Sequence, residues 1–349
     1  MDADILLILL QDGVVNGAIY ALLALSLVLV FAVTRVVFIP QGEFVAYGAL
    51  AYAALNEGRL PGSVWLLLGL GAAACAAGLL QGRHTLTGAG LARLVAETIA
   101  LPVLIAGVAL WMAPRKLGVA PEALLALTLT APMAPYLYRV AFQPLAEASV
   151  LTLLIAAVGV HLALQGLGLV FFGPEGYRAP GFSDARVEVG PLVVPGQAFW
   201  ILGVTVALMA ALYAFFGYTL AGKALRATAV NRLGARLVGI ATSLSGRVAF
   251  ALAGGIGALS GVLIAPLTTV YYDSGFLTGL KGFVAAIIGG LVSYPAAALA
   301  AVVVGCVESV SSFYASAFKE VIVFTVVIPV LLWRSLRGRA AGGAEDDHE

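Results

Sequence analysis

The sequence of 349 residues is poor in charge, and this shortage excludes several classes of protein. Only 11% of its residues are Asp, Glu, Lys or Arg, whereas a soluble domain has about 25%. Hydrophobic residues make up 62%, and a water-soluble globule could not cover that much apolar surface. The formal net charge is +1, so there is no bulk positive field to hold a nucleic acid. The composition excludes a soluble globule, a disordered chain and a nucleic-acid binder.

The sequence also has few residues that carry covalent or metal chemistry. Its two cysteines, Cys75 and Cys306, lie singly in apolar segments, which favours packing roles over a metal, redox or disulfide role. His161 lies in an apolar segment without metal-ligand spacing, where it either packs or lines a path. There is no G-x-x-x-x-G-K-[ST] motif, so the chain has no P-loop of its own for ATP. We therefore expect no catalytic residues, no metal and no cofactor in this chain.

What the sequence does have is long apolar runs. A membrane-spanning helix needs about 20 residues, and continuous runs favour helices over the alternating strands of a barrel. Candidate spans lie at about 5–33, 41–56, 62–80, 97–113, 122–138, 148–172, 197–219, 246–270, 281–293, 295–311 and 319–334. We predict an all-α integral membrane protein, a helical bundle of about ten to eleven transmembrane segments. It would form a single domain over 1–339, followed by a disordered acidic tail at 340–349.

The positions of Lys and Arg predict the orientation. The acidic start, with Asp2 and Asp4, is unlike a signal peptide, so the first run is expected to be a permanent span. If the N-terminus faces out and the spans alternate, twelve of the nineteen Lys and Arg residues fall inside, as the positive-inside rule requires. The Gly- and Pro-rich loop 173–196 then faces out. The loop 220–247 and the C-terminus face the cytoplasm.

The loop 220–247 has five basic residues and no acidic one. We predict a short helix from about Lys223 to Leu237, because apolar residues recur there at every fourth position. The residues of this predicted helix that are candidates for contact with a partner are Lys223, Leu225, Arg226, Ala229, Leu233, Arg236 and Leu237. By pattern alone the loop is either a topology signal or a docking surface for a cytoplasmic partner.

A few polar residues lie within the apolar spans, where an ionisable group is costly and tends to face a cavity or a partner. The candidates for a translocation path are Asn16, Tyr20, Gln41, Glu43, Lys281 and Glu308. Glu43 has a second interpretation, as a helix-start carboxylate that interacts with the helix dipole. An ion pair of Lys281 with either Glu308 or Glu43 is compatible with the sequence.

Six stretches in order along the chain resemble the permease subunits of branched-chain amino acid ABC importers. They are VNGAIYAL (15–22), QGE (41–43), RVAFQPL with the following span (139–175), GKALRATAVNRLGARLVGI (222–240), the stretch from LSGVLIAP to GCVES (259–309), and FKEVIVFTVVIPVLLWR (318–334). The sequence departs from the family at 38–41, where FIPQ replaces N-F-A-H, and at Asn231, which replaces an acidic residue. Residues 81–137 look like an added hairpin of two spans, which leaves the downstream orientation unchanged.

The resemblance implies a transport permease in the cell (inner) membrane, with no ATPase motif of its own. Its partners would be P-loop ATPase subunits that bind the ATP and contact 220–247, a second permease subunit, identical or related, and a soluble substrate-binding protein. The cargo would be a branched-chain or similar amino acid. Two alternatives stay open, namely a sugar permease of the ABC class and an ion-coupled secondary transporter. The second would usually show midplane carboxylates and repeated broken helices.

Overall fold

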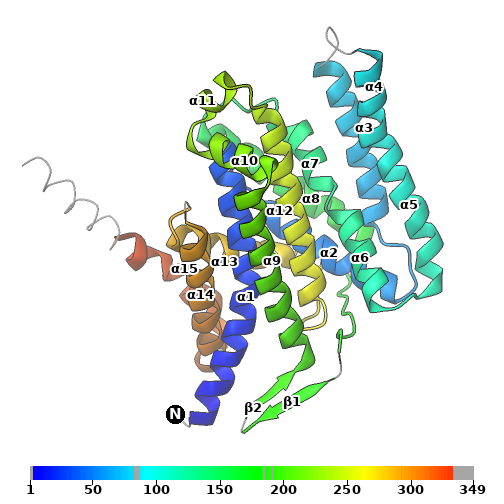
Figure 1. Cartoon of the computed structure of the whole chain (residues 1–349). Helices are drawn as coiled ribbons and strands as arrows, with labels where there is room; N and C mark the ends of the chain where they lie inside the picture. Colours follow the sequence, from blue (N-terminus) through cyan, green and yellow to red (C-terminus); the bar gives the residue numbers. More distant parts are fainter. Residues whose placement is uncertain (1–2, 82–86, 184, 191, 292, 333–349) are drawn as a thin grey trace, which may run out of the picture.

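The computed structural model describes residues 3–81, 87–183, 185–190, 192–291 and 293–332, and these form a bundle of helices with one small β-hairpin (Figure 1). The helices are α1 (Ala3–Thr34), α2 (Gln41–Asn56), α3 (Ser63–Gln81), α4 (Gly88–Val95), α5 (Leu101–Met112), α6 (Val119–Thr130), α7 (Met133–Leu137), α8 (Val150–Phe172), α9 (Gly196–Tyr218), α10 (Leu220–Val230), α11 (Arg232–Leu237), α12 (Thr242–Ile264), α13 (Ser274–Ile288), α14 (Tyr294–Tyr314) and α15 (Lys319–Thr325). Short π or 3-10 turns are η1 (Ala96–Ala100), η2 (Ala113–Arg115), η3 (Tyr138–Phe142) and η4 (Ser316–Phe318). The strands are β1 (Arg186–Val189) and β2 (Leu192–Pro195).

Seven helices among the described residues are long and apolar enough to cross a membrane. They are α1, α3, the continuous helix Gly88–Arg115, α8, α9, α12 and α14. The multi-span helical class is therefore confirmed. The count of ten to eleven is not confirmed, because α2, α6, α7, α13 and α15 are each shorter than the roughly 20 residues of a full span.

The segment predicted as an added hairpin contains two antiparallel helical stretches. The first runs from Gly88 through η1 to Met112, and the second returns as α6 and α7 (Figure 1). The expectation of one uninterrupted span over 122–138 was wrong, because α6 ends at Thr130 and a turn precedes α7. Pro132 lies in that turn, and proline removes a helix hydrogen bond.

The centre of the bundle is α2, which is buried along almost its whole length. It crosses α12 and α13, and next to it Phe38 packs against Phe44, Phe142 and Phe250 with ring centroids 4.7–6.2 Å apart. A helix of 16 residues can be this apolar on every side only when other helices surround it. The prediction of a helix at 41–56 is confirmed.

Helices α1 and α14 pack through glycines. A Cβ atom on Gly17 would lie 2.6 Å from the Cα atom of Val302, and one on Gly305 would lie 2.3 Å from the carbonyl oxygen of Gly13. Gly13 and Gly17 are four residues apart and so share one face of α1. This small-residue contact lets the two backbones touch, as in many membrane helix pairs.

The region 281–311 was predicted as two short spans or one broken helix. It forms two separate helices, α13 and α14, joined by a turn in which Gly290 (φ 90°) and Leu291 (φ 58°) have left-handed backbones. Helix α13 begins seven residues earlier than predicted, at Ser274 instead of 281. Lys281 therefore lies in the middle of α13 and not at its start.

At one end of the molecule the loop 173–196 contains the hairpin of β1 and β2, which pair antiparallel with Val187 opposite Val194. The N-terminal end of α1 is at this same end, and α10 and α11 lie at the opposite end (Figure 1). The tail predicted to be disordered, 340–349, lies outside the described residues, as do the last two residues of the predicted span 319–334.

Candidate functional site

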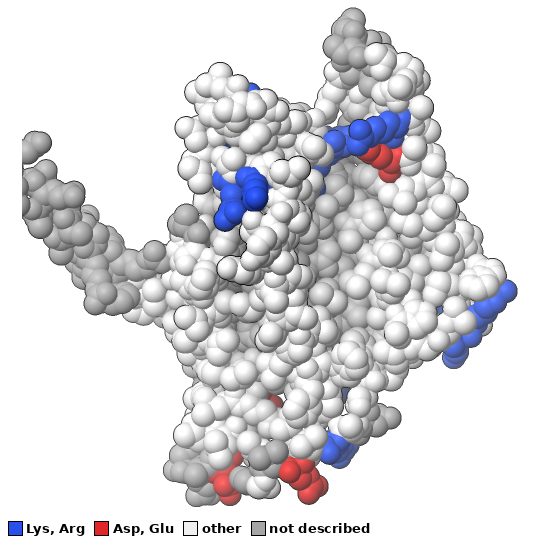
Figure 2. Space-filling view, in the orientation of Figure 1, with Lys and Arg blue, Asp and Glu red and all other residues white. Residues whose placement is uncertain are grey.

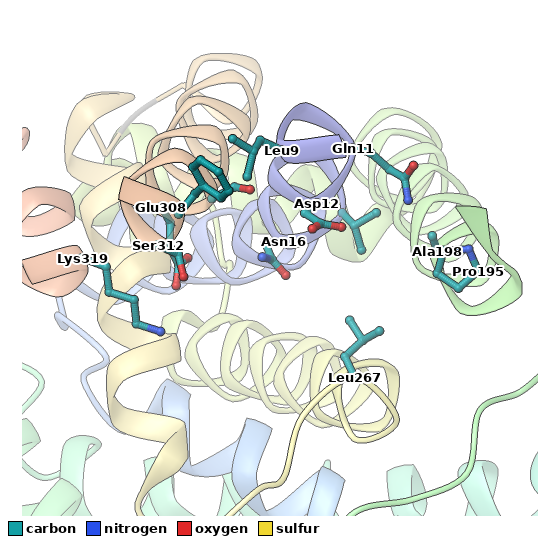
Figure 3. A pocket seen from close by; sticks show the side chains of 13 residues that line it. Leu9, Gln11, Asp12, Asn16, Pro195, Ala198, Leu267, Glu308, Ser312 and Lys319 are labelled. Carbon is teal, nitrogen blue, oxygen red and sulfur yellow. The ribbon is translucent and has the colours of Figure 1, made fainter. Parts of the chain in front are cut away.

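A cavity of about 520 Å³ opens at the hairpin end, between α1, α14 and the start of α15 (Figure 3). Residues from α9 and from the segment after α12 complete its wall. The lining side chains are Leu9, Gln11, Asp12, Val15, Asn16, Pro195, Ala198, Leu267, Glu308, Ser309, Ser312, Phe313 and Lys319. The volume lies within the range of about 300–1,000 Å³ that is usual for small-molecule sites.

Helix periodicity explains why polar groups gather in this cavity. Asp12 and Asn16 are four residues apart on α1, and Glu308 and Ser312 are four apart on α14, so each pair shares a helix face. Lys319, at the first position of α15, extends into the same space (Figure 3). The cavity thus has carboxylates and an ammonium group beside an apolar wall.

The Glu308 carboxylate also belongs to a buried ionic network. The Lys281 Nζ atom lies 2.5 Å from Glu308 Oε1 and 3.1 Å from Glu320 Oε1. The Tyr20 hydroxyl donates a hydrogen bond of 2.5 Å to Glu308 Oε2. The side chains of Lys281 and Glu308 are 8% and 10% exposed. Of the two ion pairs that the sequence allowed for Lys281, the structure has the one with Glu308.

Gln41 and Glu43 belong to a second cluster, away from this cavity. Glu43 is fully buried in the first turn of α2, with its Oε1 atom 2.8 Å from His161 Nδ1 on α8. The His161 ring stacks on Phe276 at a centroid distance of 4.6 Å. Gln41 Nε2 donates a hydrogen bond of 2.9 Å to the carbonyl oxygen of Ala253. This cluster ties α2 to α8, α12 and α13.

The structure thus brings together four of the six path candidates. Glu308, Lys281 and Tyr20 form one network, and Asn16 lines the cavity that Glu308 also lines. Sequence reasoning missed Ser312 and Lys319 as lining residues. The spacing of Ser312 from Glu308 was a usable signal, whereas nothing in the sequence places the start of α15 beside α1.

At the opposite end, the predicted helix over 223–237 is two helices, and the prediction of one was wrong. Asn231 has an extended backbone (φ −148°, ψ 101°) and caps α11 by accepting a hydrogen bond of 2.8 Å from the Gly234 amide. Asparagine favours such an N-cap over a helix interior. The apolar stripe is broken as well, because Leu225 is buried whereas Leu233 and Leu237 are 68% and 80% exposed.

Buried contacts fix both short helices to the bundle. Leu225 of α10 packs in a cluster with residues of α1 and α12, and the Thr228 hydroxyl lies 3.1 Å from that of Ser245. Arg232 donates a hydrogen bond of 2.9 Å to the carbonyl oxygen of Ala146. These contacts leave an apolar surface facing away from the bundle, and its residues are Leu220, Val230, Leu233, Leu237 and Val238.

Basic side chains flank this surface, and Figure 2 shows blue groups near α10. Lys223, Arg226 and Arg236 are all exposed. Arg236 pairs with Glu147 at 2.5 Å, and this hydrogen-bonded guanidinium holds the pKa of the Glu147 carboxyl below its ordinary value. An exposed surface of apolar and basic groups is the chemistry of a protein contact.

Comparison with known proteins adds family information. A family model described as the permease component of the branched-chain amino acid transport system matches residues 99–332. The high-affinity branched-chain amino acid transport system permease protein LivH of Escherichia coli K12 is 32% identical over 203 residues, which cover 56% of this chain and 65% of LivH. BraD of Pseudomonas aeruginosa, described in the same words, is 29% identical over 203 residues, 66% of its length. The match thus spans slightly less than two thirds of these relatives.

Proposed function

This chain belongs to the family of branched-chain amino acid transport permeases, and on that premise we propose that it is the membrane-spanning subunit of an ATP-driven importer. Its cargo would be a branched-chain or similar amino acid. ATP would be bound by a separate P-loop subunit, because the sequence has no P-loop motif.

The observation that carries this proposal is the mixed charge of the cavity at the hairpin end. A free amino acid has an ammonium group, a carboxylate and, in this class, an apolar side chain. Asp12 offers a carboxylate for the ammonium, and Lys319 offers an ammonium for the carboxylate. Leu9, Val15 and Phe313 offer an apolar wall. A sugar has no charges for these groups to pair with, so the cavity favours an amino acid.

The two ends of the molecule suggest where the partners bind. The basic and apolar surface on α10 and α11 would contact the ATPase, and the excess of Lys and Arg at that end favours a cytoplasmic position. The hairpin end would then face out, where a soluble binding protein delivers the cargo. A second permease subunit would complete the pathway in the inner membrane, and the C-terminus would be cytoplasmic.

The test is in two steps. The tagged chain is first purified from its own membranes in mild detergent, and the proteins that accompany it are identified by mass spectrometry. We expect a P-loop ATPase and a permease of the same family. A chain that purifies alone, in a detergent that keeps known importers intact, would instead support an ion-coupled secondary transporter.

The recovered complex is then reconstituted in liposomes, and ATP-dependent uptake of radiolabelled leucine is measured. Asp12→Asn and Lys319→Met should each reduce uptake about tenfold or more, the ratio for one lost charged hydrogen bond. The control Lys116→Met removes an exposed lysine in the turn after η2 and should leave uptake unchanged. Uptake that is equal in all four proteins would refute the assignment of the cavity.

A further inference from the structure

Three arginines and one glutamate meet where α4 and η1, η3 and the start of α12 come together. Arg93 Nε lies 2.7 Å from Glu97 Oε1, and an Arg247 guanidinium nitrogen lies 3.5 Å from Glu97 Oε2. Arg139 has no hydrogen-bond or ion-pair partner among the residues that the structure describes. The four side chains line a cavity of about 360 Å³, together with the amides of Gln81 and Gln143.

The cluster has an excess of positive charge that the protein does not neutralise. Three guanidinium groups face one carboxylate, and that carboxylate is already shared between Arg93 and Arg247. The Arg247 side chain is 28% exposed and Arg139 is half-buried, so water screens these two charges only in part, whereas the Arg93 side chain is 77% exposed. Guanidinium groups in such a setting bind phosphate oxygens strongly, through paired and charge-assisted hydrogen bonds.

An apolar groove continues from the same four charged residues. It encloses about 260 Å³. Its further lining residues are Thr98, Leu101, Pro132, Pro135, Tyr136, Leu244, Val248 and Ala251. Leu101 of α5 and Leu244 of α12 are 44% and 48% exposed. A ligand that fills both spaces must have an anionic head and a hydrocarbon tail.

The location of the cluster agrees with that chemistry. Arg93 lies in the last turn of α4, near the start of the continuous helix Gly88–Arg115, and Arg247 lies near the start of α12. Both are at the end of the molecule that also has α10 and α11 (Figure 1). In Figure 2 a row of blue groups with a red group beside it crosses from the helices of the bundle toward α4. In a membrane that the long apolar helices cross, this end of the bundle would lie at the level of the phospholipid headgroups, where basic pockets between helices bind acidic lipids.

We propose that this pocket binds an acidic phospholipid, with its phosphate on Arg139, Arg247 and Arg93 and one acyl chain in the adjoining groove. The lipid would bridge the helices of 88–142 to α12, which these charges would otherwise push apart.

The experiment is native mass spectrometry of the purified protein in detergent, titrated separately with phosphatidylglycerol, phosphatidylcholine and glycerol 3-phosphate. We expect tight binding of phosphatidylglycerol alone. In Arg139→Gln we expect its affinity to fall about tenfold, as for one lost charged hydrogen bond. The variant breaks no ion pair within the described part of the chain, so Glu97 keeps both of its partners. The control Arg115→Gln removes an exposed arginine at the far end of the continuous helix Gly88–Arg115, which carries Arg93 and Glu97 near its start.

Each alternative has its own result. Equal binding of phosphatidylcholine, or unchanged affinity in Arg139→Gln, would overturn the proposal. Glycerol 3-phosphate that binds as tightly as the lipid would show a site for a free phosphate ester and would refute the role of the groove. If Arg139→Gln does not fold, Arg139→Lys replaces it. We expect that variant to keep part of the affinity, because it keeps the charge and loses the paired geometry.

Discussion

The ion pair between Lys281 and Glu308 makes a sharp prediction for stability. Lys281→Met leaves Glu308 and Glu320 as two carboxylates that share no cation, and the Glu308 side chain is only 10% exposed. Breaking a buried ion pair by removing one partner costs about 3–5 kcal/mol, because the other charge stays buried without compensation. We therefore expect Lys281→Met to lower the free energy of unfolding by that amount.

Lys319 provides a matched control, because it pairs with Glu320, as Lys281 does. Its Nζ atom lies 4.0 Å from Glu320 Oε1, and its side chain is 39% exposed. A pair of this kind contributes about 0–1 kcal/mol, so Lys319→Met should change stability by no more than that. Removal of the ammonium group should therefore lower the free energy of unfolding much more at Lys281 than at Lys319, because Lys281 is buried.

The assay is denaturant unfolding in micelles, followed by circular dichroism, for both single variants and for the double variant Lys281→Met/Glu308→Gln. The double variant has no buried charge at this pair, so it should recover part of the loss. A coupling energy of about 2 kcal/mol or more is expected for groups in direct contact. If Lys281→Met were no less stable than Lys319→Met, the argument from burial would be refuted.

Three further predictions concern packing, orientation and coupling. Gly17→Leu should destabilise the protein by about 3 kcal/mol, measured by the same unfolding assay, because its Cβ atom would lie 2.6 Å from the α14 backbone. A cysteine at Ser183, in a chain freed of its two cysteines, should react with an impermeant thiol reagent in intact cells if the hairpin end faces out as proposed. Leu233→Asp should lower ATP-dependent uptake about tenfold or more, because the exposed Leu233 side chain would lose its apolar contact with the proposed ATPase subunit. The amount of protein in the membrane should be normal.

Each of these predictions has a control of the same type. Gly203→Leu is the control for packing, since nothing lies within 4 Å of the added Cβ atom; an equal loss in both would contradict the close α1–α14 contact. A cysteine at the exposed Ala227 of α10 should react only after lysis, and the reverse pattern would invert the orientation. Leu117→Asp changes an exposed leucine far from α10, and this variant should transport normally. Normal transport by Leu233→Asp as well would contradict the proposed contact of α10 and α11 with the ATPase.

The sequence predicted individual helices better than their breaks. The bounds of α2 were predicted correctly because Pro40 ends the preceding segment and polar residues follow Leu55. The break at Pro132 was missed although proline is a known helix breaker, because the apolar run continues across it. The break at Asn231 was missed for a similar reason, since the four-residue repeat of apolar side chains passes through it.

The site was predictable to the extent that it depends on one helix at a time. A polar residue in an apolar span is visible in the sequence, and Glu308 and Lys281 were found in this way. The neighbour of each depends on which helices pack together. Glu43 meets His161 only because α2 crosses α8, and no periodicity within either segment contains that information.

The glycine contact between α1 and α14 also restricts how the cavity can change shape. Backbones that touch at Gly13, Gly17 and Gly305 leave no room to slide or tilt against each other. Asp12 and Glu308, one on each helix, should then keep their separation through the cycle of the proposed importer, because the two helices would move as one rigid unit. The opening and closing of the cavity would come from its other walls, which are the start of α9, the segment after α12 and the start of α15.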